Sequence, residues 1–149
     1  MSNKFHKLQL ETLDKKISKV RFQAKPKNGW ARTIRSCLKM SLPFVAKKFG
    51  ASPQAIFQFE RGEIDETISL KTLRRLAEAI DCELHYALIP HQKSLKKTIE
   101  KRSAIKAKSI VSEVDKSMSL ENQKVKNSKK SVKVLAKDLA SDLNSKLWD

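Results

Sequence analysis

Helix start and stop signals recur so densely in residues 41–69 that they constrain the fold more than any other feature. Ser41-Leu42-Pro43 and Ser52-Pro53 each place a hydroxyl N-cap before a proline in the first turn, which is typical of a helix start. Gly50 is suited to end the first of these helices in the left-handed conformation. Because only residues 50–52 separate the two predicted helices, the pattern indicates a helix-turn-helix.

Further helices are predicted around this pair. The second helix of the pair is expected over residues 54–61, with Gly62 closing it. A preceding helix is expected over residues 29–39 and a following one over residues 69–81, because apolar residues recur there at helical spacing. The angle between the two central helices would be set by a small apolar core of Val45, Ala46 and Ile56.

Residues 82–90 (CELHYALIP) alternate between apolar and other side chains with a period of two, which predicts a single β-strand. A single strand is not stable alone. We therefore expect it to pair with its copy in a second subunit, giving a homodimer. Pairing within the chain, for example with the N-terminal segment, is the alternative.

Composition divides the chain into three parts. Residues 1–27 contain an expected amphipathic helix from Phe5 to Arg21, and residues 28–90 hold the predicted helix-turn-helix and strand. Residues 91–149 contain no glycine or proline and are expected to form a C-terminal helical arm. The predicted fold class is mainly all-α.

The arm carries an apolar stripe at helical spacing, formed by Val132, Leu135, Leu139, Leu143 and Leu147. Such a stripe needs a covering surface. The candidates are the N-terminal helix of the same chain, a second subunit or another protein.

The chain has 32 Lys and Arg against 16 Asp and Glu, a formal charge of +16, which favours a polyanionic partner. With no secretory signal and no apolar run beyond four residues, we expect a cytoplasmic protein without a membrane partner. Cys37 and Cys82 are expected to be reduced. No nucleotide-binding loop or metal-ligand spacing is present, so we expect neither an enzyme nor a bound cofactor or metal.

Several segments resemble known DNA-binding proteins. The runs MSLPFVA (residues 40–46) and FGASPQAIFQFERG (residues 49–62) resemble the helix-turn-helix of the Xre/Cro-C1 family. A narrower resemblance, to the group called mobile mystery protein A, is carried by Gly29-Trp30, Ile34-Arg35, TISLKTLR (residues 67–74), CELHYALIP (residues 82–90) and the Leu147-Trp148 ending. The resemblance covers most of the chain and is closest over residues 29–90. It implies DNA binding and a gene paired with that of a Fic-domain protein.

The second helix would present Gln54, Ala55, Phe57 and Gln58 at its N-terminal end. Glutamine can pair bidentately with adenine, so Gln54 and Gln58 are the expected base-reading residues, and Ala55 would contact a thymine methyl. Ser52, with the free N–H groups of the helix N-terminus, is suited to a phosphate. Phe57 either stacks on thymine methyls or packs against a partner or the neighbouring helix.

Basic residues around this helix are the expected clamps on the DNA backbone. They are Lys47, Lys48, Arg61, Lys71 and Arg74, with Arg32 and Arg35 as further candidates. Two positions depart from the family pattern. Leu42 stands where the family often has a phosphate-contacting glutamine, and Pro53 replaces a residue that commonly reaches DNA, so no contact is assigned to either.

A hexapeptide in the arm points to a second partner. Residues 117–122 (SMSLEN) fit the inhibitory motif of Fic-domain regulators, Ser/Thr-x-x-x-Glu-Gly/Asn, through Ser117, Glu121 and Asn122. In that family the glutamate pairs with an arginine that otherwise holds the ATP γ-phosphate, which stops AMP transfer; a carboxylate offers the guanidinium the same bidentate anion. The alternative is a solvent-facing helix end.

These observations predict an antitoxin with two activities, inhibiting a Fic-domain AMP-transferase through Glu121 and repressing its own operon through Gln54 and Gln58. One alternative is a stand-alone Xre-family transcriptional repressor whose tail only dimerises or adds DNA affinity. Another is a non-specific nucleic-acid-binding protein.

Overall fold

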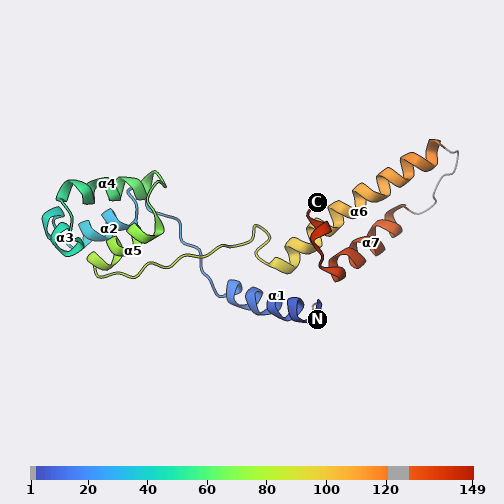
Figure 1. Cartoon of the computed structure of the whole chain (residues 1–149), viewed down its shortest axis with the longest axis horizontal. Helices are drawn as coiled ribbons and strands as arrows, with labels where there is room; N and C mark the ends of the chain where they lie inside the picture. The colour runs from blue at the N-terminus through green and yellow to red at the C-terminus, as the bar shows by residue number, and fades with distance from the viewer. Residues whose placement is uncertain (1–2, 121–127) are drawn as a thin grey trace. The chain divides into compact units, whose positions relative to one another are not determined.

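A computed structural model describes residues 3–120 and 128–149, and in these residues the chain is mainly helical (Figure 1). It forms two compact units, which we call the helix-turn-helix unit (Phe22–Ala87) and the arm unit (Met1–Arg21 with Leu88–Asp149). In chain order the elements are α1 (Asn3–Ser18), α2 (Trp30–Cys37), α3 (Leu42–Phe49), α4 (Pro53–Ile64), α5 (Leu70–Ala79), α6 (Leu95–Leu120), α7 (Ser128–Asp142) and the short 3-10 helix η1 (Ser145–Leu147).

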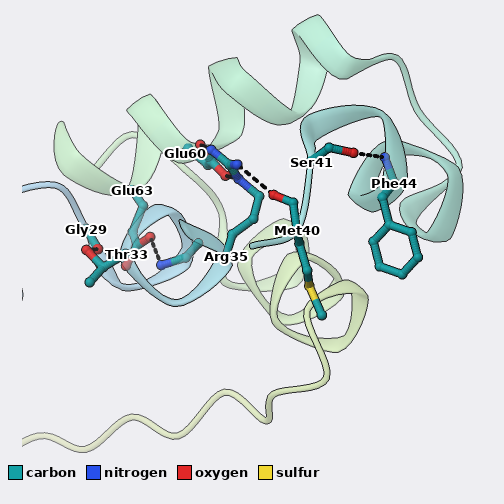
Figure 2. Close-up of polar contacts among 9 residues, drawn as sticks. Gly29, Thr33, Arg35, Met40, Ser41, Phe44, Glu60 and Glu63 are labelled. Carbon is teal, nitrogen blue, oxygen red and sulfur yellow. Dashed lines mark hydrogen bonds and ion pairs between the residues drawn. The ribbon is translucent and has the colours of Figure 1, made fainter. Parts of the chain in front are cut away.

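The predicted Ser41, Ser52 and Gly50 caps of the helix-turn-helix unit are confirmed. The Ser41 hydroxyl accepts a hydrogen bond from the Phe44 N–H at 3.3 Å (Figure 2), and Ser52 and Ser69 cap α4 and α5 in the same way. Gly50 follows α3 with a φ of +83°, the left-handed conformation that glycine adopts without strain. Serine hydroxyls and one glycine thus define the ends of the short helices.

The predicted core is also confirmed. Val45, Ala46 and Ile56 are buried and hold α3 and α4 together. From α5 and the residue that follows it, Leu76 and Ile80 complete the same cluster. Burial of these apolar side chains is the main force that holds the short helices of this unit in place.

The prediction that Gly62 ends the second helix is wrong, because α4 runs through it to Ile64. The Gly62 carbonyl accepts hydrogen bonds from the N–H groups of Thr67 and Ile68, at 2.9 and 3.2 Å. A Cβ at Gly62 would lie 3.4 Å from the Ile68 Cβ. The returning loop therefore packs against Gly62 within a continuous helix, and Gly62 is not a helix stop.

The prediction of a strand over residues 82–90 is wrong for the described part of the chain, where this segment has no regular secondary structure. A strand requires a neighbouring backbone, and no described segment forms a ladder of hydrogen bonds with it. Its N-terminal part still belongs to the helix-turn-helix unit, since the Cys82 N–H donates to the Ala77 carbonyl at 2.9 Å.

In the arm unit, α6 packs along α7 and also contacts α1. Ser103 and Ala107 of α6 are fully buried, and their small side chains allow a close approach. In the apolar stripe predicted for the arm, Leu147 is buried and the other members are half-buried. The surface that covers the stripe is therefore supplied, at least in part, by the same chain.

Asp14 of α1 connects the N-terminal helix to the start of α6. Its carboxylate accepts hydrogen bonds from the N–H groups of Leu95 and Lys96, at 2.6 and 3.1 Å, and from the Ser94 hydroxyl at 2.8 Å. Burial alone would raise the pKa of Asp14, but these hydrogen bonds and the Lys96 charge outweigh burial and lower it.

In the described residues, no helix has the length and apolar character needed to cross a membrane.

Candidate nucleic-acid interface

The second helix of the motif, α4, has one buried face and one exposed polar face. Ile56 and Glu60 point into the unit, whereas Gln54, Gln58 and Arg61 are exposed. The three exposed residues are spaced by four and three positions, so they share one face of the helix. The structure therefore brings together both predicted base-reading glutamines and a predicted phosphate-binding arginine.

The N-terminal end of α4 offers fewer free donors than the sequence predicted. The Ser52 hydroxyl already accepts the Ala55 N–H at 3.1 Å, and Pro53 has no N–H. Of the first N–H groups, that of Gln54 remains for an incoming phosphate. Ala55 itself is half-buried.

Phe57 lies on α4 with 38% of its surface exposed. Most of the residue is thus covered within its own chain, and its exposed part is available for contact with a base or a partner. The partial exposure of Phe57 is compatible with both predicted roles, contact with thymine methyls and apolar packing.

Exposed basic residues flank α4 on the neighbouring helices. Lys47 lies on α3, and Lys71 and Arg74 lie on α5. None of these three forms an ion pair within the described part of the chain, so their charges are directed to solvent. Lys48 differs: its Nζ lies 3.0 Å from the Asp81 Oδ1 and 5.4 Å from the Phe44 ring centroid.

Arg35 is not a backbone clamp, contrary to its placement among the further candidates. Its Nε lies 2.5 Å from the Glu60 Oε1, its Nη2 lies 3.1 Å from the Glu60 Oε2, and its Nη1 donates to the Met40 carbonyl (Figure 2). The guanidinium joins α2 to α4 and to the residue before the α3 cap. Arg32, by contrast, is exposed and stays a candidate.

Two acidic residues on the buried face of α4 hold this helix in place. Sequence reasoning missed both. Glu60 pairs with Arg35, and Glu63 accepts hydrogen bonds from the Trp30 and Ala31 N–H groups at 2.7 and 2.9 Å, which caps α2. A signal for both was present, because they follow Ile56 by four and seven residues and so share its buried face.

Gly29 is required by this cap. Its φ is +77°, and a Cβ there would lie 3.0 Å from the Glu63 Oε2. Any other residue at position 29 would be strained and would press on the carboxylate that caps α2. Figure 2 shows Gly29 and Glu63 together at the α2 N-terminus.

The structure places only part of the second motif. Ser117 is exposed near the end of α6, while Glu121 and Asn122 lie outside the described residues. The two predicted sites belong to different units of the chain. The residues that the structure describes contain no cluster of His, Cys, Asp and Glu suited to a metal ion.

Comparisons with known proteins give no relative: no family model, no curated protein and no solved structure matches this chain.

Proposed function

We propose that the protein is a sequence-specific DNA-binding repressor that reads its operator with α4. The observation that carries this proposal is the exposed face of α4, where Gln54 and Gln58 project from a helix whose opposite face is buried through Ile56. A capped helix-turn-helix places such a face in the major groove, where glutamine can recognise adenine. Lys47, which follows the buried Val45 and Ala46 of α3, would contact the phosphate backbone of the DNA.

The test begins with selection of a binding site from a random duplex library, followed by titration of each variant. Gln54→Ala and Gln58→Ala should each weaken binding to the selected site by about 1–3 kcal/mol and change binding to random DNA little. Gln9→Ala, an exposed glutamine of α1, is the matched control and should bind normally. Equal losses on selected and random DNA would contradict sequence-specific reading and favour non-specific binding.

The backbone contacts have a different signature. Lys71→Gln and Arg74→Gln should weaken binding similarly on selected and random DNA. Each should reduce the slope of log binding constant against log salt concentration by about 1, the value for one lost phosphate contact. Lys4→Gln, on exposed α1, provides a comparison for the loss of one positive charge elsewhere. An unchanged salt slope for both α5 variants would remove these residues from the interface.

We also propose that the protein binds DNA as a homodimer. Helix-turn-helix proteins commonly place two recognition helices one turn apart on a two-fold operator. The period-two segment that begins at Cys82 and is left unpaired in the described chain supports such an assembly.

The second proposed activity is inhibition of a Fic-domain AMP-transferase, which would make the protein an antitoxin. Support comes from residues 117–122 and from the resemblance to a group paired with Fic proteins. Glu121 would pair with the toxin's γ-phosphate arginine, a charge-assisted contact that competes with productive ATP binding.

Co-expression with the product of the adjacent gene tests whether this chain binds a Fic-domain protein and inhibits it. Glu121→Ala should release AMP transfer while the complex still forms. Glu113→Ala is the matched control, because Ser109–Glu113 has the same spacing but is followed by Val114 and so lacks the full motif. A Fic partner that stays silent with Glu121→Ala would contradict the motif, and absence of any complex would favour a stand-alone repressor.

A further inference from the structure

The segment from Cys82 to Tyr86 leaves the last helix of the helix-turn-helix unit with side chains that its own chain covers only partly. Tyr86 is 65% exposed, and residues 82–85 all border a groove of about 440 Å³ with a mainly apolar lining. Trp30, which is 41% exposed, also lines this groove. A backbone without ladder partners beside an incompletely covered apolar surface is a site for strand addition.

The two other residues of this segment form a polar pair. Glu83 and His85 lie two positions apart, and the Glu83 Oε2 is 3.2 Å from the His85 Nε2. Their side chains are 86% and 79% exposed. In an extended chain they share one face, and Cys82, Leu84 and Tyr86 share the other. An extended segment would therefore have one apolar face and, opposite it, one polar face on which Glu83 is the acceptor and His85 the donor.

We propose that this segment pairs with the same segment of a second copy, antiparallel and with Leu84 on the two-fold axis. This inference rests on the homodimer proposed above and assigns its interface and register. Leu84 would lie opposite its copy, Glu83 opposite His85 of the partner subunit, and Cys82 opposite Tyr86 of the partner subunit.

The register follows from the side chains. Residues directly opposite each other in an antiparallel pair point to the same face, so an axis between two residues would set apolar against polar side chains. An axis at Glu83 would oppose two carboxylates, and an axis at His85 would oppose two imidazoles. Only the axis at Leu84 sets each Glu83 opposite a His85 within the segment, with acceptor facing donor.

A second copy is the favoured occupant because the pattern is complementary to itself. The segment reads apolar, Glu83, Leu84, His85, apolar. When a second copy runs antiparallel about Leu84, each carboxylate meets an imidazole and each apolar residue meets an apolar residue. In this register Tyr86 of the partner subunit reaches the Cys82 end of the segment, beside the groove that Trp30 lines.

Disulfide trapping of the full chain, oxidised in the absence of DNA, tests the register. In a Cys37→Ser, Cys82→Ser background, Leu84→Cys should cross-link, because directly opposed Cα atoms lie about 4.5–5.5 Å apart. Tyr86→Cys in that background should not cross-link, since the Cα atoms of its two copies would be about 14 Å apart. Tyr86→Cys with Cys82 retained and Cys37→Ser should cross-link through Cys82. Circular dichroism establishes that each variant is folded.

Charge exchange gives a second test without cysteines. His85→Glu sets two carboxylates opposite each other twice per dimer and should raise the dimer dissociation constant about 2- to 30-fold. The double variant Glu83→Lys, His85→Glu restores opposite charges across the pair and should recover dimerisation. Light scattering measures the mass against the 17.0 kDa of one chain.

A wild-type protein that stays monomeric, or a double variant as weak as His85→Glu alone, would overturn the inference. Cross-linking of Tyr86→Cys without Cys82, together with none for Leu84→Cys, would also overturn it. These readouts need no DNA, so they fail independently of the glutamine substitutions that test operator reading.

Discussion

Loss of the Arg35 side chain should destabilise the helix-turn-helix unit by several kcal/mol, because it would leave the carboxylate of Glu60 buried without a partner. The Glu60 side chain is 2% exposed and that of Arg35 is 13% exposed, and two guanidinium nitrogens contact the two carboxylate oxygens. Removing one member of such a pair costs about 3–5 kcal/mol. The whole stability of a unit of this size is roughly 3–10 kcal/mol, so Arg35→Met should bring it close to unfolding.

The assay is urea unfolding followed by Trp30 fluorescence, with Trp148→Phe as background so that the signal reports on this unit. The double variant Arg35→Met, Glu60→Leu removes both charges and should recover much of the lost stability, since replacing a buried pair by apolar residues is often neutral. Lys48→Met is the matched control. It removes an exposed partner of Asp81 and should cost less than about 1 kcal/mol.

Two results would contradict a buried, partner-dependent carboxylate at Glu60: a loss of stability in Arg35→Met no larger than in Lys48→Met, or a double variant as unstable as Arg35→Met. Either result would mean that the Glu60 carboxylate finds water or another partner when the guanidinium is removed.

Three further substitutions test the caps and turns. Glu63→Ala leaves the first N–H groups of α2 without an acceptor and should lower the free energy of unfolding by about 1–3 kcal/mol in the same urea assay; a neutral effect would contradict the cap. Gly50→Ala should cost about 1–2 kcal/mol there, entirely from the positive φ, because no atom lies within 4 Å of the added Cβ; a larger loss would indicate a clash. Asp14→Asn should lower the melting temperature of the arm unit at pH 7. Because the folded-state pKa of Asp14 is lowered, the ionised carboxylate stabilises above its unfolded pKa of about 3.9, and that stabilisation is lost as pH falls through the folded value. The difference between wild type and Asp14→Asn should therefore shrink on acidification, and a constant difference between pH 7 and pH 3 would exclude this role.

Much of the helix-turn-helix unit could be predicted because its signals are local. A serine hydroxyl three residues before the N–H that it receives, a proline in the first turn and a glycine with positive φ all act within a few residues. The buried core at Ile56 and the exposed glutamines of α4 follow from helical spacing once those ends are known.

Other features depended on contacts between residues far apart in the chain. Arg35 looked like one more cation until the fold placed it 2.5 Å from a carboxylate 25 positions away. The sequence predicts a helix stop at Gly62, but α4 continues through it and the returning loop donates hydrogen bonds to its carbonyl. Composition alone does not distinguish a solvent-facing charge from a buried one.

By itself the sequence determined which short segments become helices, where the serine caps of α3, α4 and α5 lie, and which face of α4 is polar. Arg32 and Arg35 of α2 are both expected from the sequence to contact DNA. Tertiary structure alone decided that Arg35 is paired and holds the unit together, while Arg32 is exposed. It also decided that the segment after Cys82 forms no strand with the residues of its own chain that the structure describes. The physical reason is the same in both cases: a serine cap is completed within three residues, whereas an ion pair, a β-ladder or the Glu63 cap of α2 exists only when the fold brings a distant partner within hydrogen-bond distance.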